Sequence, residues 1–237
     1  MNRNDPLTLH EQLMLLMLQD DSGTMESHTT MYHLALGGSL LAQLLLSGAV
    51  TIDAEDKNYV RVSRAKRLGD PILDECLELV SHAKRPRRAA DWVSLFGGLK
   101  RLRHRIAEEL CRKGILEDSE DKVLFFFTRS VYPTINPAPE RRLVDSLRDA
   151  ILGDSRDLQP DVVLLIALAH ATGLLRIHFD KRQLKDRKER IERIAKGDMV
   201  GSATADAVRA AEAAVQAAQA AVMAAIIAST VVTNVTH

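Results

Sequence analysis

The sequence has few of the residues from which disulfide frameworks and membrane spans are built. Its 237 residues include only two cysteines, Cys76 and Cys111, and both fall on segments with helical apolar spacing. A disulfide framework needs more cysteines than this, so we interpret both as free thiols in a reducing compartment. No run of about 18 apolar residues occurs, so no transmembrane helix is expected.

We expect no secretory leader, and the overall charge is not of one sign. The first apolar stretch, LTLHEQLMLLML, is interrupted by His10, Glu11 and Gln12, and no cleavage site follows. We therefore expect a cytoplasmic protein, peripheral on the cytoplasmic face of a membrane. The formal net charge is zero, yet ten lysine or arginine residues and three acidic residues lie between Lys84 and Lys113. Such a local patch can bind an anion although the whole chain is neutral.

Motifs for catalysis, cofactor binding and metal binding are missing as well. There is no phosphate-binding loop, no dinucleotide glycine pattern, no Gly-x-Ser-x-Gly nucleophile and no metal-ligand spacing among the histidines. We therefore assign no catalytic residue, no metal and no cofactor, and an enzyme is the third hypothesis. His170 lies in the apolar stretch LALAHAT. A lone histidine there is typically a core residue, so we predict it to be buried, hydrogen-bonded and non-catalytic.

Hydrophobic periodicity predicts a mainly α protein, a single compact multi-helix domain with two small β-hairpins. The helices are expected over 8–19, 30–47, 70–83, 90–96, 99–114, 136–153, 160–172 and 205–229, with a charged segment over 179–196 and hairpins over 50–62 and 115–128. Tails 1–6 and 230–237 should flank a domain of residues 7–229. Thr8 and Glu11 fit a capping box, and Asp70-Pro71 fits a helix cap with its first turn.

The segment from 99 to 128 carries the strongest functional signal. Lys100, Arg101 and Arg103 crowd the first turns of the predicted helix. Basic residues are unfavourable at a helix N-terminus unless an anion is present, because this end carries partial positive charge. Lys100 and Arg103 lie three residues apart, which predicts that they share one helix face. A solvated face with scattered ion pairs is the alternative interpretation.

An apolar hairpin is predicted directly after this helix. Residues 118–121 are expected to form its turn, and residues 123–128, with three consecutive phenylalanines, its second strand. Successive side chains of a strand point to opposite faces, so both faces would be apolar. We expect one face to contact a membrane or a second copy of the chain, with burial of both faces as the alternative. The contact residues would be Leu124, Phe125, Phe126 and Phe127.

Two binding functions are compatible with this pattern. A basic helix followed by a hairpin resembles a winged helix, in which Arg101 and Arg105 would face nucleic acid. An anionic lipid headgroup held by Lys100 and Arg103 is the other possibility, and it explains the apolar hairpin better. We therefore favour a peripheral module that binds an anionic phospholipid membrane, and nucleic acid is the less favoured partner.

Four segments, in order along the chain, carry a family resemblance. They are LTLHEQLMLLMLQDDSGT, LLAQLLLSGAV, LRHRIAEELCRKGIL with its hairpin, and LIALAHATGLL. Together they resemble the Golgi phosphoprotein 3 family over residues 7–229. The resemblance implies a mostly helical domain that binds phosphatidylinositol 4-phosphate on membranes and acts as an adaptor for membrane or glycosylation proteins. Because only six residues precede the first helix, we expect a bacterial member rather than a eukaryotic Golgi adaptor.

The resemblance also implies particular residues for these roles. The two basic residues of the family's headgroup site fall on Lys100 and Arg103. The family's tryptophan and second-helix arginine fall on His28 and Gly37, so we expect a general preference for anionic lipid rather than strict selectivity. The family hairpin falls on residues 115–128 and implies membrane contact and homo-oligomers, while the protein client is not identified.

Overall fold

The computed structural model describes residues 6–18, 32–53, 59–64, 66–123 and 127–200, with single positions between 208 and 220, and for 120–123 and 127–129 it describes the backbone alone. Helices of the first half are α1 (Leu9–Met17), α2 (Tyr32–Leu46), α3 (Pro71–Ser81), α4 (Ala89–Gly97) and α5 (Leu102–Arg112). Those of the second half are α6 (Ala138–Leu152), α7 (Pro160–Ala171), α8 (Leu175–His178), α9 (Lys181–Asp186) and α10 (Lys188–Ala195). Strands are β1 (Val50–Asp53), β2 (Tyr59–Val62), β3 (Arg87–Arg88), β4 (Ser119–Val123) and β5 (Phe127–Val131). The predicted mainly α fold with two small sheets is confirmed.

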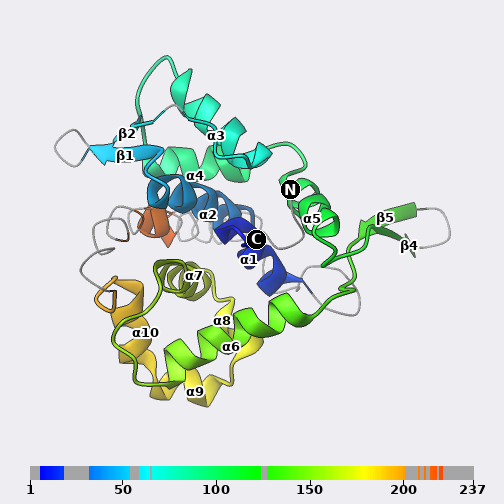
Figure 1. The fold of residues 1–237 in the computed structure, drawn as a ribbon, viewed down its shortest axis with the longest axis vertical. Coiled ribbons are helices and arrows are strands. Elements are labelled where there is room, and N and C mark those ends of the chain that lie inside the picture. The colour runs from blue at the N-terminus through cyan, green and yellow to red at the C-terminus, as the bar shows by residue number, and fades with distance from the viewer. Residues whose placement is uncertain are drawn as a thin grey trace, which may run out of the picture.

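The core is built around α1, α2 and α7, which pack on one another in the middle of the molecule (Figure 1). Helices α3 and α4 lie on one side of this centre and α6 to α10 extend to the other. Every residue of α1 is buried, and so are residues 163–169 of α7. The nearly continuous apolar sequence of α7 thus predicts its central place correctly.

The predicted caps start their helices. The backbone N–H of Thr8 donates to the Glu11 carboxylate at 2.8 Å, which completes the capping box of α1. Asp70 Oδ1 accepts from the N–H groups of Ile72 and Leu73 at 2.9 and 3.0 Å, and Pro71 occupies the first turn of α3. Both caps satisfy amides that a helix start leaves without intrahelical partners.

Two glycines bring α2 and α4 into backbone contact. A Cβ at Gly37 would overlap the carbonyl oxygen of Val93, and a Cβ at Gly97 would overlap that of His33. Gly97 therefore serves close packing and belongs to α4, whereas the chain leaves the helix at Gly98. No larger residue fits at either position without moving one helix away from the other.

The first predicted hairpin is present and has a third strand. β1 pairs with β2 in antiparallel register, Val50 opposite Val62, as predicted. β3 adds to the free edge of β2, with Tyr59 opposite Arg88. A two-residue edge strand shows no alternation of apolar and polar residues, so periodicity could not reveal it.

The second hairpin is present in a different register from the prediction. Ser119 pairs with Val131 and Val123 with Phe127, so the predicted turn over 118–121 and the predicted strand over 123–128 are both wrong. Figure 1 shows this hairpin projecting away from the helices. The polar residues that suggested a turn are part of β4, because backbone pairing with β5, and not the polarity of the side chains, sets the limits of this strand. Leu124, Phe125 and Phe126 lie outside the described residues.

The last third of the chain follows the prediction where it is described. The charged segment over 179–196 forms α9 and α10, with Ile191 and Ile194 buried and Leu184 half-buried, whereas the short α8 lies before it and was not predicted. The described positions of the alanine-rich segment are helical or buried, among them Val208, Ala211, Ala214, Val215 and Ala217. Residues 1–5 and 230–237 of the predicted tails lie outside the described part.

Candidate functional site

Helix α5 begins three residues later than predicted. Gly98 closes α4 by donating its N–H to the carbonyl oxygens of Ser94 and Leu95, and residues 98–101 form a turn. Arg101 then caps α5 in the left-handed conformation, with φ 56°. Leu99 lies three residues before Leu102 and matches the apolar stripe even from a turn, so periodicity could not locate this boundary.

The start of α5 has no side-chain cap. Arg101 makes no capping hydrogen bond, and the backbone N–H groups of Arg103 and His104 have no acceptor among the described residues. The Leu102 amide donates to the Leu99 carbonyl oxygen at 3.1 Å. Two amides at the positive end of a helix are thus left to bind water or an anion.

The three predicted site residues lie together at the start of α5, and only one of them forms an ion pair with a described residue. The Arg101 guanidinium is 3.5 Å from the Glu108 carboxylate. Lys100 is exposed, Arg103 is half-buried, and neither forms an ion pair with a described acidic residue. Lys100 precedes the helix, so the two residues do not share a helix face in the predicted sense, yet both flank the free amides. Counting the described residues alone, the site offers two cations without an ion pair beside two backbone amides without an acceptor.

His104 connects the first turn of α5 to the body of the protein through Tyr132. His104 Nδ1 lies 3.0 Å from the Tyr132 hydroxyl, and the two rings meet edge to face. Burial lowers the pKa of His104, and the charges of Arg103 and Arg101 lower it further. His104 is therefore neutral at pH 7, and its contact with the buried Tyr132 holds the first turn of α5 against the body of the protein.

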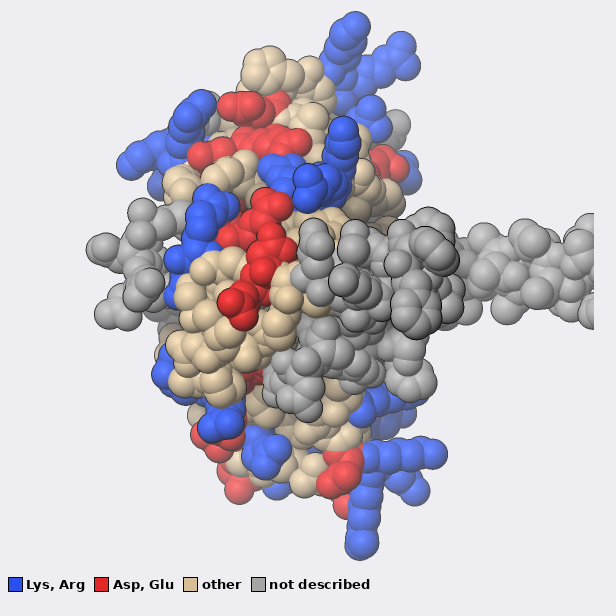
Figure 2. All heavy atoms as spheres, turned by 90° about the vertical axis from the view of Figure 1, so that its right-hand side faces the viewer, with Lys and Arg blue, Asp and Glu red and all other residues tan. Residues whose placement is uncertain are grey.

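The surroundings of the site are mixed in charge. Figure 2 views the molecule from the side on which α5 and the β4–β5 hairpin lie, and its basic side chains are interspersed with acidic ones. Arg105, one turn into α5, is paired with Glu75 at 2.5 Å. This face therefore favours a compact anion over an extended polyanion, which needs a continuous basic surface.

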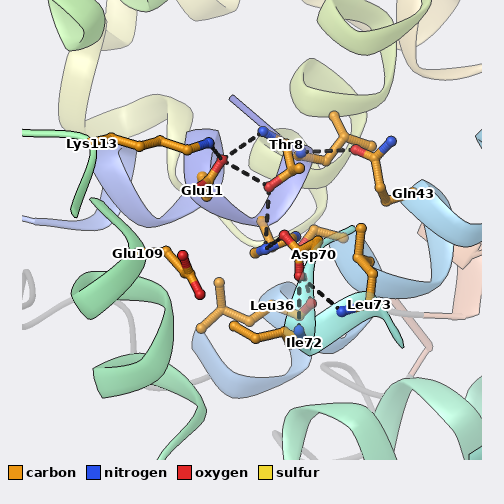
Figure 3. A network of polar contacts seen from close by, with 12 residues as sticks. Thr8, Glu11, Leu36, Gln43, Asp70, Ile72, Leu73, Glu109 and Lys113 are labelled. Carbon is orange, nitrogen blue, oxygen red and sulfur yellow. Dashed lines mark hydrogen bonds and ion pairs between the residues drawn. The ribbon is translucent and has the colours of Figure 1, made fainter. Parts of the chain in front are cut away.

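A buried polar network lies at the other end of α5 and was not predicted (Figure 3). Lys113 Nζ is 2.6 Å from the Glu11 carboxylate, and both side chains are almost fully buried. His10 Nε2 is 3.2 Å from Asp70 Oδ2, and the Thr8 hydroxyl lies within hydrogen-bonding distance of both Glu11 and His10. The network ties α1, α3 and α5 together. Its signal in the sequence was the set of polar residues inside the apolar first helix.

The carboxylates of this junction titrate in opposite directions. Burial raises the pKa of Glu109, and Arg112 opposes this effect while Asp70 and Glu11 add to it. Burial also acts to raise the pKa of Asp70, but the hydrogen bond and charge of His10 and two backbone amides outweigh it and leave the pKa low. Within the described residues no group of histidine, cysteine and acidic side chains could hold a metal ion.

The prediction for His170 is wrong. The residue is exposed at the end of α7, and no hydrogen bond to a described residue is found. Neighbours adjacent in sequence point to other faces of a helix, so an apolar stretch does not bury each of its members. Among the described residues the buried histidine is instead His10, which lies beside Thr8 and Asp70, while the half-buried His178 places its Nε2 2.9 Å from the Leu16 carbonyl oxygen.

The remaining predicted site residues stay untested. His28, Leu124, Phe125 and Phe126 lie outside the described residues, and Phe127 is described only as the first residue of β5. Among the described helices, each is too short or too polar to cross a bilayer. Cys76 is buried and Cys111 half-buried, and both are free thiols.

Comparison with known proteins gives two findings. The family model described as Golgi phosphoprotein 3 (GPP34) matches residues 9–211. The chain is also 25% identical to vacuolar protein sorting-associated protein 74 of Eremothecium gossypii, in an alignment that covers 73% of this chain and 61% of that protein. The chain thus aligns with less than two thirds of the length of this curated relative. Because the family match extends over most of the sequence, the chain belongs to the Golgi phosphoprotein 3 (GPP34) family.

Proposed function

We propose that this protein is a peripheral membrane-binding module that recognises anionic lipid headgroups, of the phosphatidylinositol 4-phosphate type, at the start of α5. We further propose that it serves there as a non-enzymatic adaptor for membrane or glycosylation proteins. Membership of the GPP34 family supports a membrane-associated adaptor role in general. The lipid and the residues that bind it are inferred from the geometry of the site.

The observation that carries the proposal is that charged side chains and backbone amides at the start of α5 lack partners among the described residues. Lys100 and Arg103 have no described counter-ion, and the amides of Arg103 and His104 have no described acceptor. The helix dipole makes this the unfavourable end for two cations, by about 0.3–1 kcal/mol each. A phosphate group would accept from the amides and neutralise the cations, so it removes the unfavourable term at this turn.

Gly37 supports a general preference for anionic lipid over strict selectivity. It occupies the position that the family resemblance assigns to a headgroup arginine. Because α2 and α4 touch through their backbones at this point, no side chain fits there. The headgroup would therefore be held by the α5 turn without an arginine from that position.

The β4–β5 hairpin is proposed as the second membrane contact. Strands β4 and β5 project from the body of the molecule (Figure 1), which suits a contact with a bilayer or with a second copy of the chain. The residues proposed for this contact are Leu124, Phe125, Phe126 and Phe127. Aromatic side chains favour the boundary between headgroups and acyl chains, which fits such a contact.

The nucleic-acid alternative is less well supported. It requires Arg101 and Arg105 to be available for phosphates, and each is paired with a carboxylate, Glu108 and Glu75 respectively. Breaking such a pair reduces the gain from a new phosphate contact. The pairing leaves Lys100 and Arg103 as the available cations, which suits one headgroup better than a duplex.

Liposome flotation tests the proposal. The double variant Lys100→Glu, Arg103→Glu should bind acidic vesicles more than about tenfold more weakly than the wild type, because each basic residue at an anionic surface contributes about 1 kcal/mol. Binding by the wild type should fall as salt is raised and should be weak on phosphatidylcholine vesicles. Titration with random duplex DNA at the same salt measures the alternative.

A matched control is available at the C-terminal end of α10. Arg193 and Lys196 are also exposed cations three residues apart, so Arg193→Glu, Lys196→Glu makes the same change of charge elsewhere. This control should retain most of the binding. Equal loss in both double variants would show non-specific attraction, and equal binding by wild type and the α5 variant would place the site elsewhere.

A further inference from the structure

A hollow of about 660 Å³ lies between the end of α7 and helices α8, α9 and α10. Its floor is apolar. Leu175, Phe179 and Ile191 are buried beneath it, and Leu184 is half-buried at its side. The volume falls within the range of small-molecule sites, which is about 300–1,000 Å³.

The rim of this hollow is cationic. Its charged residues are Arg176, Lys181, Lys185 and Lys188, all exposed, and none of the described lining residues is acidic. Lys188 lies 3.7 Å from the Glu192 carboxylate, while the other three have no ion pair with a described acid. Like charges of which only one has a described counter-ion repel one another, so the rim favours an anion.

The pKa of His170, which is one of the lining residues, depends on the charges around the hollow. Desolvation lowers the pKa of His170, the Glu192 carboxylate opposes this, and the charges of Arg176 and Lys188 add to it. The imidazole is therefore neutral at pH 7. A negative group seated among these cations would raise the pKa of His170, because it would stabilise the charged ring.

We propose that this hollow binds a single-chain amphipathic anion, an acyl chain that ends in a carboxylate or a phosphate. The chain lies on Phe179 and Ile191, and the anionic end meets the lysines. A neutral apolar molecule would leave the cations unpaired, and a small hydrophilic anion would leave the floor in water. Only a ligand with both properties is complementary to floor and rim. The site is separate from the α5 turn, which lies at another part of the molecule (Figure 1).

Displacement of a fluorescent dodecanoic acid tests this proposal on the full chain, below the micelle concentration. Dodecanoate or dodecyl phosphate should displace the probe, and which one does so more strongly tells whether the head is a carboxylate or a phosphate. Dodecanol and dodecyltrimethylammonium should displace it at least about tenfold more weakly, because they cannot pair with the rim. Equal displacement by dodecanol, or no binding of the probe, overturns the proposal.

Two sets of variants locate the binding. Lys181→Gln, Lys185→Gln, Lys188→Gln should weaken probe binding by about tenfold or more. Three exposed cations outside the lining serve as the matched control: Arg182→Gln, Arg193→Gln, Lys196→Gln. An equal effect of both sets would mean that binding depends on total charge alone, which contradicts the proposal.

Two further measurements keep the test independent of stability and of the headgroup site. Proton NMR of the His170 ring should show its pKa rising when dodecanoate is added, which a purely structural effect would not produce. Lys100→Glu, Arg103→Glu should leave probe binding unchanged. If it abolished probe binding, the ligand would be bound at α5 and not in this hollow.

Discussion

The two ends of α5 both carry basic residues, but these differ in burial, in ion pairing and in their position relative to the helix dipole. Lys113 caps the C-terminal end, where the helix dipole favours a cation, and it is buried against Glu11 at 2.6 Å. Lys100 and Arg103 stand at the N-terminal end, where the dipole disfavours them, and they have no described counter-ion. A structural partner accounts for the first arrangement and not for the second. Residue type alone therefore does not separate structure from function, whereas burial and partners do.

The buried end also shows how charge is tolerated inside the protein. A buried ion pair contributes little net stability, because desolvation of both groups offsets their attraction. Removing one partner is different, since the other is left charged and unpaired. The contact between Lys113 and Glu11 thus fixes how α5 packs on α1. Its loss should lower the stability of the whole fold.

The largest expected effect comes from Lys113→Met. It leaves the Glu11 carboxylate buried without its cation, so the free energy of unfolding should fall by about 3–5 kcal/mol. Urea denaturation measures the change. Lys100→Met is the matched control at the other end of α5 and should change stability by less than about 0.5 kcal/mol. Similar losses in both variants would break the contrast between the two ends.

An intermediate, pH-dependent effect is expected for Asp70→Asn. The variant keeps the cap of α3 but loses the charge beside His10, so it should cost about 1–3 kcal/mol at neutral pH. The pKa of Asp70 is depressed below 3.8 in the folded protein, so its charge contributes stability above that pH. That contribution is lost as the pH falls through the folded-state pKa. Unfolding curves of the two proteins should therefore converge in acid, and a constant difference would contradict the assignment.

The smallest effect concerns the left-handed cap of α5. Arg101→Gly should raise stability by up to about 1 kcal/mol, because glycine adopts φ 56° without steric cost. Arg103→Gly is the opposite control. Arg103 is helical, so glycine there should lower stability by about 1 kcal/mol. Thermal melting compares the two. A loss of stability in both variants would mean that Arg101 carries no backbone strain.

Much of the fold was predictable because its signals are local. The capping box of Thr8 and Glu11, the Asp70 cap and the apolar sequence of α7 each act within a few residues, and all three were confirmed. Register and boundaries were harder. The register of β4 and β5 and the start of α5 depend on how these segments pack against the rest of the protein, and not on their local sequence.

The candidate site divides in the same way. The crowding of Lys100, Arg101 and Arg103 was visible in the sequence, but their pairing was not. Only the fold shows that Arg101 is engaged with Glu108 while the other two lack described acidic partners. The exposure of His170 and the cationic hollow beside it were likewise invisible, because they join the end of α7 to α8, α9 and α10.

The sequence by itself determined the fold class, most helix starts and the place where basic residues collect, because periodicity and capping are short-range effects. Tertiary structure alone decided which of these charges are buried, paired or free. Lys113 meets a residue 102 positions away in the chain. Such a contact depends on how α1, α3 and α5 pack, and no local pattern encodes it.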